Sequence, residues 1–157
     1  MLLPADVDID EGVRQVSAIL GELDGFLATV PGLDAEGRAD LRLVCDELCS
    51  NVVRHASRDG TTRLGIKVEA GVSSVKLTLR DDCAEFNPLV GGKPYVGSDL
   101  EQRRIGGLGL YLIRQLFPLA SYQRSDGVNI IRFEYHMGAD GVRKMQRSDT
   151  VNRLRNG

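Results

Sequence analysis

The chain lacks several features that would assign it to a special class of protein. No apolar run approaches the roughly 18 residues that a membrane span needs. The first residues, MLLPADVDIDE, lack the basic region and the long apolar core of a secretion signal. Three cysteines cannot all pair and none stands in a CxxC motif, which fits a reducing compartment. The net charge of −2 favours neither nucleic acid nor an anionic membrane as a partner, so we expect a cytoplasmic protein that binds neither.

The composition is that of an ordinary globular domain. Of the 157 residues, 42% are hydrophobic and 27% are charged, and no segment is repeated. This length predicts one domain with a sizeable core, which we assign to residues 1–137. Residues 138–157 are polar, with five Lys or Arg against two Asp, so we expect a mobile tail there.

Two helices are predicted in the first third of the chain. From Asp10 to Leu27, apolar residues recur at spacings of three and four, and Val30-Pro31-Gly32 ends this pattern. Asp34 can cap a second helix that runs to about Ser57. One arc of this second helix is apolar and consists of Leu41, Val44, Cys45, Leu48, Cys49 and Val52.

Another face of the second helix carries a polar stripe. Glu47, Asn51 and His55 recur every four residues, so their side chains lie along one side of the helix. A carboxylate, a carboxamide and an imidazole on a core helix are costly to bury without partners, which favours a bound ligand. Simpler interpretations stay open: a solvated surface for Glu47 and Asn51, and a structural hydrogen bond for His55.

An acidic residue stands in register with the apolar face of a predicted strand. Apolar residues alternate over 64–68 and again over 75–79, and residues 70–73 separate the two runs, which predicts an antiparallel hairpin. Continued alternation places Asp81 on the inward face, where an acid is unusual. The alternative is an ordinary turn residue at the end of a strand.

A long segment without sustained periodicity, residues 82–104, follows Asp81. Such loops are uncommon inside compact domains and are often lids or binding segments. The loop leads into Gly106, Gly107 and Gly109 and then into an apolar helix that ends at Pro118. Glycines at a helix N-terminus suit phosphate binding, because the backbone can approach closely and free N–H groups face the ligand. Glycines that only form the turn into a helix are the simpler alternative.

The order of elements predicts the fold class. Two more strands are expected at residues 120–124 and 129–136, and a short edge strand at residues 2–5. Two helices, a hairpin, a loop, a helix and a final hairpin indicate an α+β protein. We expect a two-layer sandwich in which the helices cover one face of a mixed, mainly antiparallel sheet.

Three motifs together carry a family resemblance. The polar-striped helix, the strand-end acid in DDCAEFNP and the glycine segment in GGLGLYLI stand in an order that resembles the GHKL, or Bergerat-fold, ATPase superfamily. Within this superfamily, whose ATP-binding domain is also called HATPase, the chain is most similar to the anti-sigma-factor serine/threonine kinases of the RsbW and SpoIIAB kind. The resemblance covers roughly residues 2–135.

The resemblance implies a role for each motif. Asn51 would bind the Mg2+ ion that bridges the ATP phosphates, and Glu47 would be the general base for a target serine. Asp81 would receive the amino group of adenine. Cys83, which stands where the family pattern has a glycine, would line the nucleotide site. The segment that holds the phosphates would comprise Gly106, Gly107, Leu108 and Gly109.

The function implied by the resemblance is that of an ATP-binding, Mg2+-dependent protein kinase in a partner-switching system of signal transduction. Its substrate would be a STAS-type anti-anti-sigma protein, it would sequester a sigma factor, and it would form a homodimer. Cys83 motivates an alternative of a different class, a catalytically inactive Bergerat-fold module that binds proteins and has weak or no nucleotide binding. A third hypothesis is a nucleotide-gated element of another signalling system.

Overall fold

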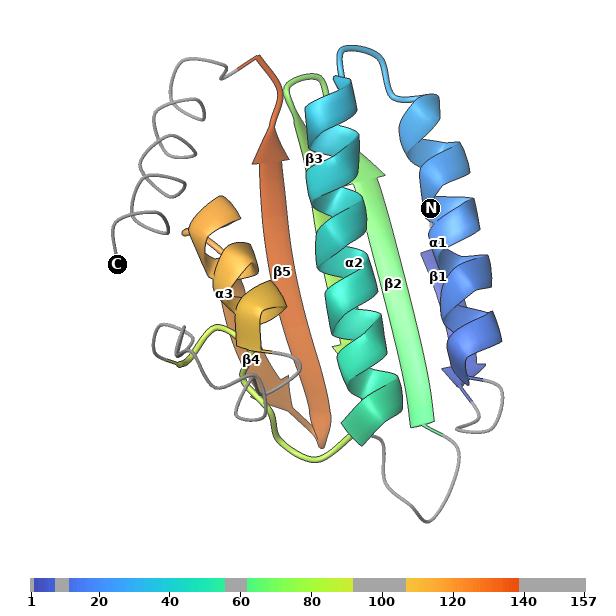
Figure 1. Ribbon diagram of the computed structural model, residues 1–157, viewed down its shortest axis with the longest axis vertical. Coiled ribbons are helices and arrows are strands. Elements are labelled where there is room, and N and C mark those ends of the chain that lie inside the picture. Colours follow the sequence, from blue (N-terminus) through green and yellow to red (C-terminus); the bar gives the residue numbers. More distant parts are fainter. Residues whose placement is uncertain (1, 8–11, 56–61, 92–106, 139–157) are drawn as a thin grey trace, which may run out of the picture.

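The computed structural model of the chain describes residues 2–7, 12–55, 62–91 and 107–138 (Figure 1). The described helices and strands are β1 (Leu2–Val7), α1 (Gly12–Ala28), α2 (Ala35–His55), β2 (Thr62–Ala70), β3 (Ser74–Asp81), α3 (Gly107–Leu116), β4 (Ser121–Ser125) and β5 (Val128–His136). Asp10, most of the predicted loop and the predicted tail beyond Gly138 lie outside these residues.

The described strands form one sheet in the order β1-β2-β3-β5-β4. All four neighbouring pairs of described strands are antiparallel, and the β2–β3 and β4–β5 hairpins are the two that the sequence predicts. The strand predicted near the N-terminus is β1, and it lies at the edge of the sheet. Figure 1 shows α1, α2 and α3 on one face of this sheet, which confirms the predicted two-layer α+β sandwich.

The core lies between the three described helices and the inward face of the sheet, with α2 at its centre. Every residue of the apolar arc predicted on α2 is buried, and Cys45 and Cys49 belong to this core with their Sγ atoms 3.9 Å apart. The sheet contributes Leu64, Ile66, Val68, Val75, Leu77, Leu79, Ile131, Phe133 and Tyr135, all of them buried. Over residues 62–69 of β2, buried positions alternate with exposed or half-buried ones, as expected for a sheet covered on one face.

Local signals fix where α2 begins and how β4 joins β5. The N–H of Gly37 donates to Asp34 Oδ1 at 2.7 Å, which confirms Asp34 as the cap of α2. The Tyr135 hydroxyl donates to the same oxygen at 3.1 Å and so connects β5 to the start of α2. Asp126 and Gly127, with φ of 50° and 79°, form the tight turn between β4 and β5.

No helix within the described ranges combines the length and the apolar character that a membrane crossing requires.

The packing of Gly37 generates a stability prediction. A Cβ at this position would overlap the ring of Tyr135, which is only 4% exposed and cannot move aside freely. We expect Gly37→Ala to lower the free energy of unfolding by about 1–3 kcal/mol, the usual effect of overpacking. Urea denaturation measures it. The matched control is Gly25→Ala in α1, where nothing lies within 4 Å of the added Cβ. There, the helix propensity of alanine should stabilise the protein by roughly 0.5–1 kcal/mol, and equal effects of the two substitutions would contradict the packing argument.

Candidate functional site

One end of the candidate site is built by α2. Asn51 is 6% exposed, and its Oδ1 accepts a hydrogen bond from Arg54 Nη1 at 3.2 Å. Its Nδ2 atom is buried and has no hydrogen-bond partner among the described residues. An unpaired buried amide nitrogen costs about 1–3 kcal/mol. The Asn51 amide is therefore prepared for a ligand that supplies an acceptor.

Asp81 forms the opposite end of the site. It is the last residue of β3, it pairs with Leu64 on β2 and Asn129 on β5, and it is 5% exposed. The inward orientation predicted from the alternation is confirmed. Asp81 Oδ1 accepts from the Cys83 N–H at 3.1 Å and from Asn129 Nδ2 at 2.8 Å. No N–H or O–H group of a described residue donates to Oδ2, and the Cys83 thiol, a weak donor, also contacts this carboxylate, so Oδ2 keeps the capacity to accept from a ligand.

Asn129 uses both ends of its side-chain amide in this network. It is 1% exposed, and its Nδ2 donates to Ala84 O at 3.0 Å as well as to Asp81. Its Oδ1 accepts from Arg124 Nη1 at 2.7 Å and from the Tyr122 hydroxyl at 2.9 Å. The neighbours therefore fix the orientation of this amide, since acceptors face its nitrogen and donors face its oxygen.

Cys83 contacts both the site and the core. Its Sγ lies 3.7 Å from Oγ1 of Thr62, which is 3% exposed. Burial raises the pKa of the Cys83 thiol above its ordinary value; the hydrogen bond with Thr62 lowers it and the charge of Asp81 raises it. The thiol is thus mainly protonated near neutral pH.

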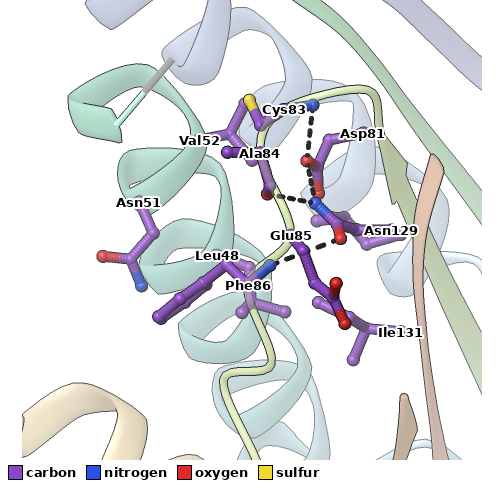
Figure 2. Close-up of a pocket in the computed structure, with 11 residues that line it drawn as sticks. Leu48, Asn51, Val52, Asp81, Cys83, Ala84, Glu85, Phe86, Asn129 and Ile131 are labelled. Atoms are coloured by element: carbon purple, nitrogen blue, oxygen red, sulfur yellow. Dashed lines mark hydrogen bonds between the residues drawn. The ribbon is translucent and has the colours of Figure 1, made fainter. Parts of the chain in front are cut away.

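A cavity of about 230 Å³ connects these groups (Figure 2). It is close to the lower limit of about 300 Å³ for pockets of drug-sized ligands, a size that suits a flat ring system. Asn51 from α2 and Asp81 from β3 lie on opposite sides of the labelled cluster in Figure 2. The lining residues are Leu48, Asn51, Val52, Leu79, Asp81, Cys83, Ala84, Glu85, Phe86, Asn129 and Ile131.

Glu47 approaches the glycine segment. A Cβ on Gly109 would overlap the carboxylate of Glu47, so the absence of a side chain at Gly109 lets α2 and the first turn of α3 come together here. Gly107 is the first residue of α3 and Leu108 follows it. Free N–H groups at such a helix start can bind an anion. Gly106 lies outside the described residues, and His55 is the last residue of α2.

The loop after β3 is fastened to the sheet and to α3 over its described part. Asn129 holds Ala84 O, and Arg114 of α3 donates from Nη1 to Pro88 O at 3.0 Å. The fold therefore brings Asn51, Asp81 and Cys83 to one pocket and sets Glu47 against Gly109.

Sequence reasoning missed Asn129 and Thr62. Both have the same inward phase as the apolar residues of their strands, a signal that was available.

Known proteins share this sequence pattern. Residues 10–135 match the histidine kinase-like ATPase domain. The chain is 31% identical over 100 residues to the serine/threonine-protein kinase BtrW of Bordetella bronchiseptica, covering 63% of this chain and 70% of that protein. It is 33% identical over 115 residues to the serine-protein kinase RsbW of Listeria innocua, covering 69% and 73%. The chain therefore belongs to the histidine kinase-like ATPase domain family and, within it, to the RsbW-like serine-protein kinases.

Proposed function

We propose that this protein is an ATP-dependent serine/threonine protein kinase that also acts as an anti-sigma factor. The observation that carries the proposal is a single pocket bordered by two buried polar groups. Asn51 Nδ2 has no hydrogen-bond partner among the described residues, and no described N–H or O–H group donates to Asp81 Oδ2. Membership of a family of serine-protein kinases supports the reaction class.

The base of ATP would occupy the Asp81 end of the pocket. Leu48, Val52 and Ile131 provide apolar walls for a flat ring. The free oxygen of Asp81 is an acceptor only, so it selects a ligand with a hydrogen to donate, such as the amino group of adenine. An apolar pocket with one placed polar group is the usual design for recognition of a small ring system.

The phosphates would extend towards Asn51 and the start of α3. Asn51 Nδ2 can donate to a phosphate oxygen, and a half-turn of the amide would instead offer its oxygen, a ligand type that suits Mg2+. When bound, Mg2+ neutralises phosphate charge during transfer. The N–H groups of Gly107, Leu108 and Gly109 would bind phosphate oxygens, and Gly106 would continue this segment.

Glu47 would accept the proton of the target hydroxyl. It lies one helical turn before Asn51 and against Gly109, so its carboxylate borders the region assigned to the phosphates. A carboxylate within reach of the attacking hydroxyl is suited to general-base catalysis of phosphoryl transfer.

The partners belong to the same proposal. The relatives are named as kinases that act on serine or threonine, which supports a protein hydroxyl as the acceptor. We assign this role to a STAS-type anti-anti-sigma protein, with a sigma factor as the competing partner and a homodimer as the assembly. Phosphorylation of the STAS protein would leave the kinase free to hold the sigma factor.

Cys83 favours a second candidate, a module that binds proteins without catalysis. Its thiol borders the pocket where a smaller residue would leave more room for the base. Such a module would bind its partner equally well with and without Asn51.

The nucleotide site is tested by calorimetric titration with ATP and ADP, with and without Mg2+. We expect ATP binding that requires Mg2+, and at least about tenfold weaker binding by Asn51→Ala, equal to about 1.4 kcal/mol. The control is Ser73→Ala in the β2–β3 turn, at the other end of the strands from Asp81. A folded protein that binds no nucleotide would support the second candidate.

The role of Glu47 is tested by phosphate transfer to the STAS partner. Glu47→Gln removes the base while retaining shape, so we expect kcat to fall about 10²- to 10⁴-fold. Because Glu47 does not line the base pocket, the Kd for ATP should stay within about threefold. Glu22→Gln on the exposed face of α1 is the control. A wild-type rate in Glu47→Gln would refute the assignment.

Cys83 provides a chemical probe of the pocket. Cys45 and Cys49 are fully buried, so iodoacetamide should label Cys83 alone in the folded protein. Burial raises the pKa of this thiol, so labelling should be slow at pH 7 and should accelerate as the pH rises, because the thiolate is the nucleophile. Saturating ADP should slow it further. Cys83→Ser controls for other sites, and equal rates with and without ADP would remove Cys83 from the nucleotide site.

A further inference from the structure

We propose that Asn129 is a positioning residue that makes the site select adenine, which presents one amino donor, over guanine, which presents two adjacent donors (N1–H and N2–H), by occupying one oxygen of Asp81. The inference deepens the proposed nucleotide function and rests on it. It begins from the row of residues in which Asp81 on β3 pairs with Asn129 on β5, and Asn129 pairs with Arg124 on β4.

The first step concerns the two oxygens of Asp81. Oδ1 already accepts two hydrogen bonds, from the Cys83 N–H and from Asn129 Nδ2, whereas no N–H or O–H group of a described residue donates to Oδ2. Asp81 is only 5% exposed, so rotation of its carboxylate would break both bonds where little solvent is available to replace them. Asp81 therefore presents one oxygen in one orientation.

The second step concerns what one oxygen can recognise. Adenine offers one amino group on its outer edge, which needs a single acceptor. Guanine offers adjacent N1–H and N2–H donors, which pair with both oxygens of a carboxylate. If guanine instead took the orientation of adenine, its O6, an acceptor, would face Asp81 Oδ2, which is also an acceptor. With Oδ1 occupied, the paired mode of guanine is not available. The selectivity thus depends on Asn129 as well as on Asp81.

The third step concerns what holds Asn129. Arg124 Nη1 donates to Asn129 Oδ1 at 2.7 Å and to Cys83 O at 3.1 Å, and the Tyr122 hydroxyl donates to the same Oδ1 at 2.9 Å. β4 thereby holds the oxygen of the Asn129 amide, while the nitrogen of that amide bonds Ala84 O in the loop after β3. A second set of hydrogen bonds of this kind keeps the group that contacts the ligand in a fixed orientation.

The experiment measures the Kd of ATP, of purine riboside triphosphate, which lacks the amino group, and of GTP. The wild-type protein should bind ATP at least about tenfold more tightly than either analogue. Asn129→Ala should weaken ATP at least about tenfold while purine riboside triphosphate changes less than about threefold. Its preference for ATP over GTP should shrink to the same extent.

Arg124→Leu keeps the test valid if Asn129→Ala does not fold, since it removes the bonds of Arg124 to Asn129 Oδ1 and Cys83 O and leaves Asn129, Asp81 and the Tyr122 hydroxyl in place. It should weaken ATP by about three- to tenfold with the same selectivity for the amino group. Gln123→Ala, an exposed position on the same strand, is the control. Equal losses for ATP and purine riboside triphosphate, or no loss for ATP, would overturn the positioning role.

A readout without nucleotide separates this inference from the proposed function. In the free protein, hydrogen exchange of the Cys83 and Phe86 amides should be at least about tenfold faster in Asn129→Ala. The Cys83 N–H bonds the carboxylate that Asn129 holds, and the Phe86 N–H bonds Asn129 Oδ1 itself. Unchanged exchange would overturn the inference even if ATP binds. Absence of ATP binding to the wild-type protein, with exchange accelerated in the variant, would refute the nucleotide proposal and leave the positioning of Asp81 supported.

Discussion

A carboxylate buried at the end of an apolar sheet face is the constraint on which the site depends. Asp81 continues the row of Leu77 and Leu79, and a charge in that row requires hydrogen-bond donors that the apolar core cannot offer. The donors come from the next backbone segment and from Asn129 on the neighbouring strand. Because β3 ends where β5 begins, antiparallel pairing brings the C-terminal end of β3 next to the N-terminal end of β5. The pocket lies at these strand ends.

One helix has to serve the core and the site together. The apolar arc of α2 packs on the sheet, and Asn51 lies beside that arc with a buried nitrogen that no residue in the described part of the chain pairs. This unsatisfied group lowers the stability of the free protein, and a ligand that satisfies it regains that free energy on binding. Glu47 belongs to the same stripe but is only half-buried, so its position against Gly109 depends on α3 rather than on the core.

The sequence predicts most of the fold because each element has a strong local signal. The arc of α2, the cap at Asp34 and the inward phase of Asp81 were all predicted from spacing and are confirmed. The same alternation puts Asn129 in phase with Ile131, yet the local pattern indicates only that a strand begins at Asn129. Its importance arises from pairing with a residue 48 positions away, and a local pattern does not contain that register. The contact of Glu47 with Gly109 is likewise tertiary.

A glycine at position 83, as in the family pattern, could provide backbone freedom or space for the base. In this chain only the space matters. Among the described non-glycine residues only Asp126 has a positive φ, so the backbone at Cys83 does not need the conformational freedom of glycine. What remains is space. The Cys83 sulfur contacts Thr62, a polar residue at the start of β2, and Cys83 also packs against the core. Backbone strain therefore gives no reason to favour the inactive module, and the two proposed functions differ in whether the sulfur leaves room for the base.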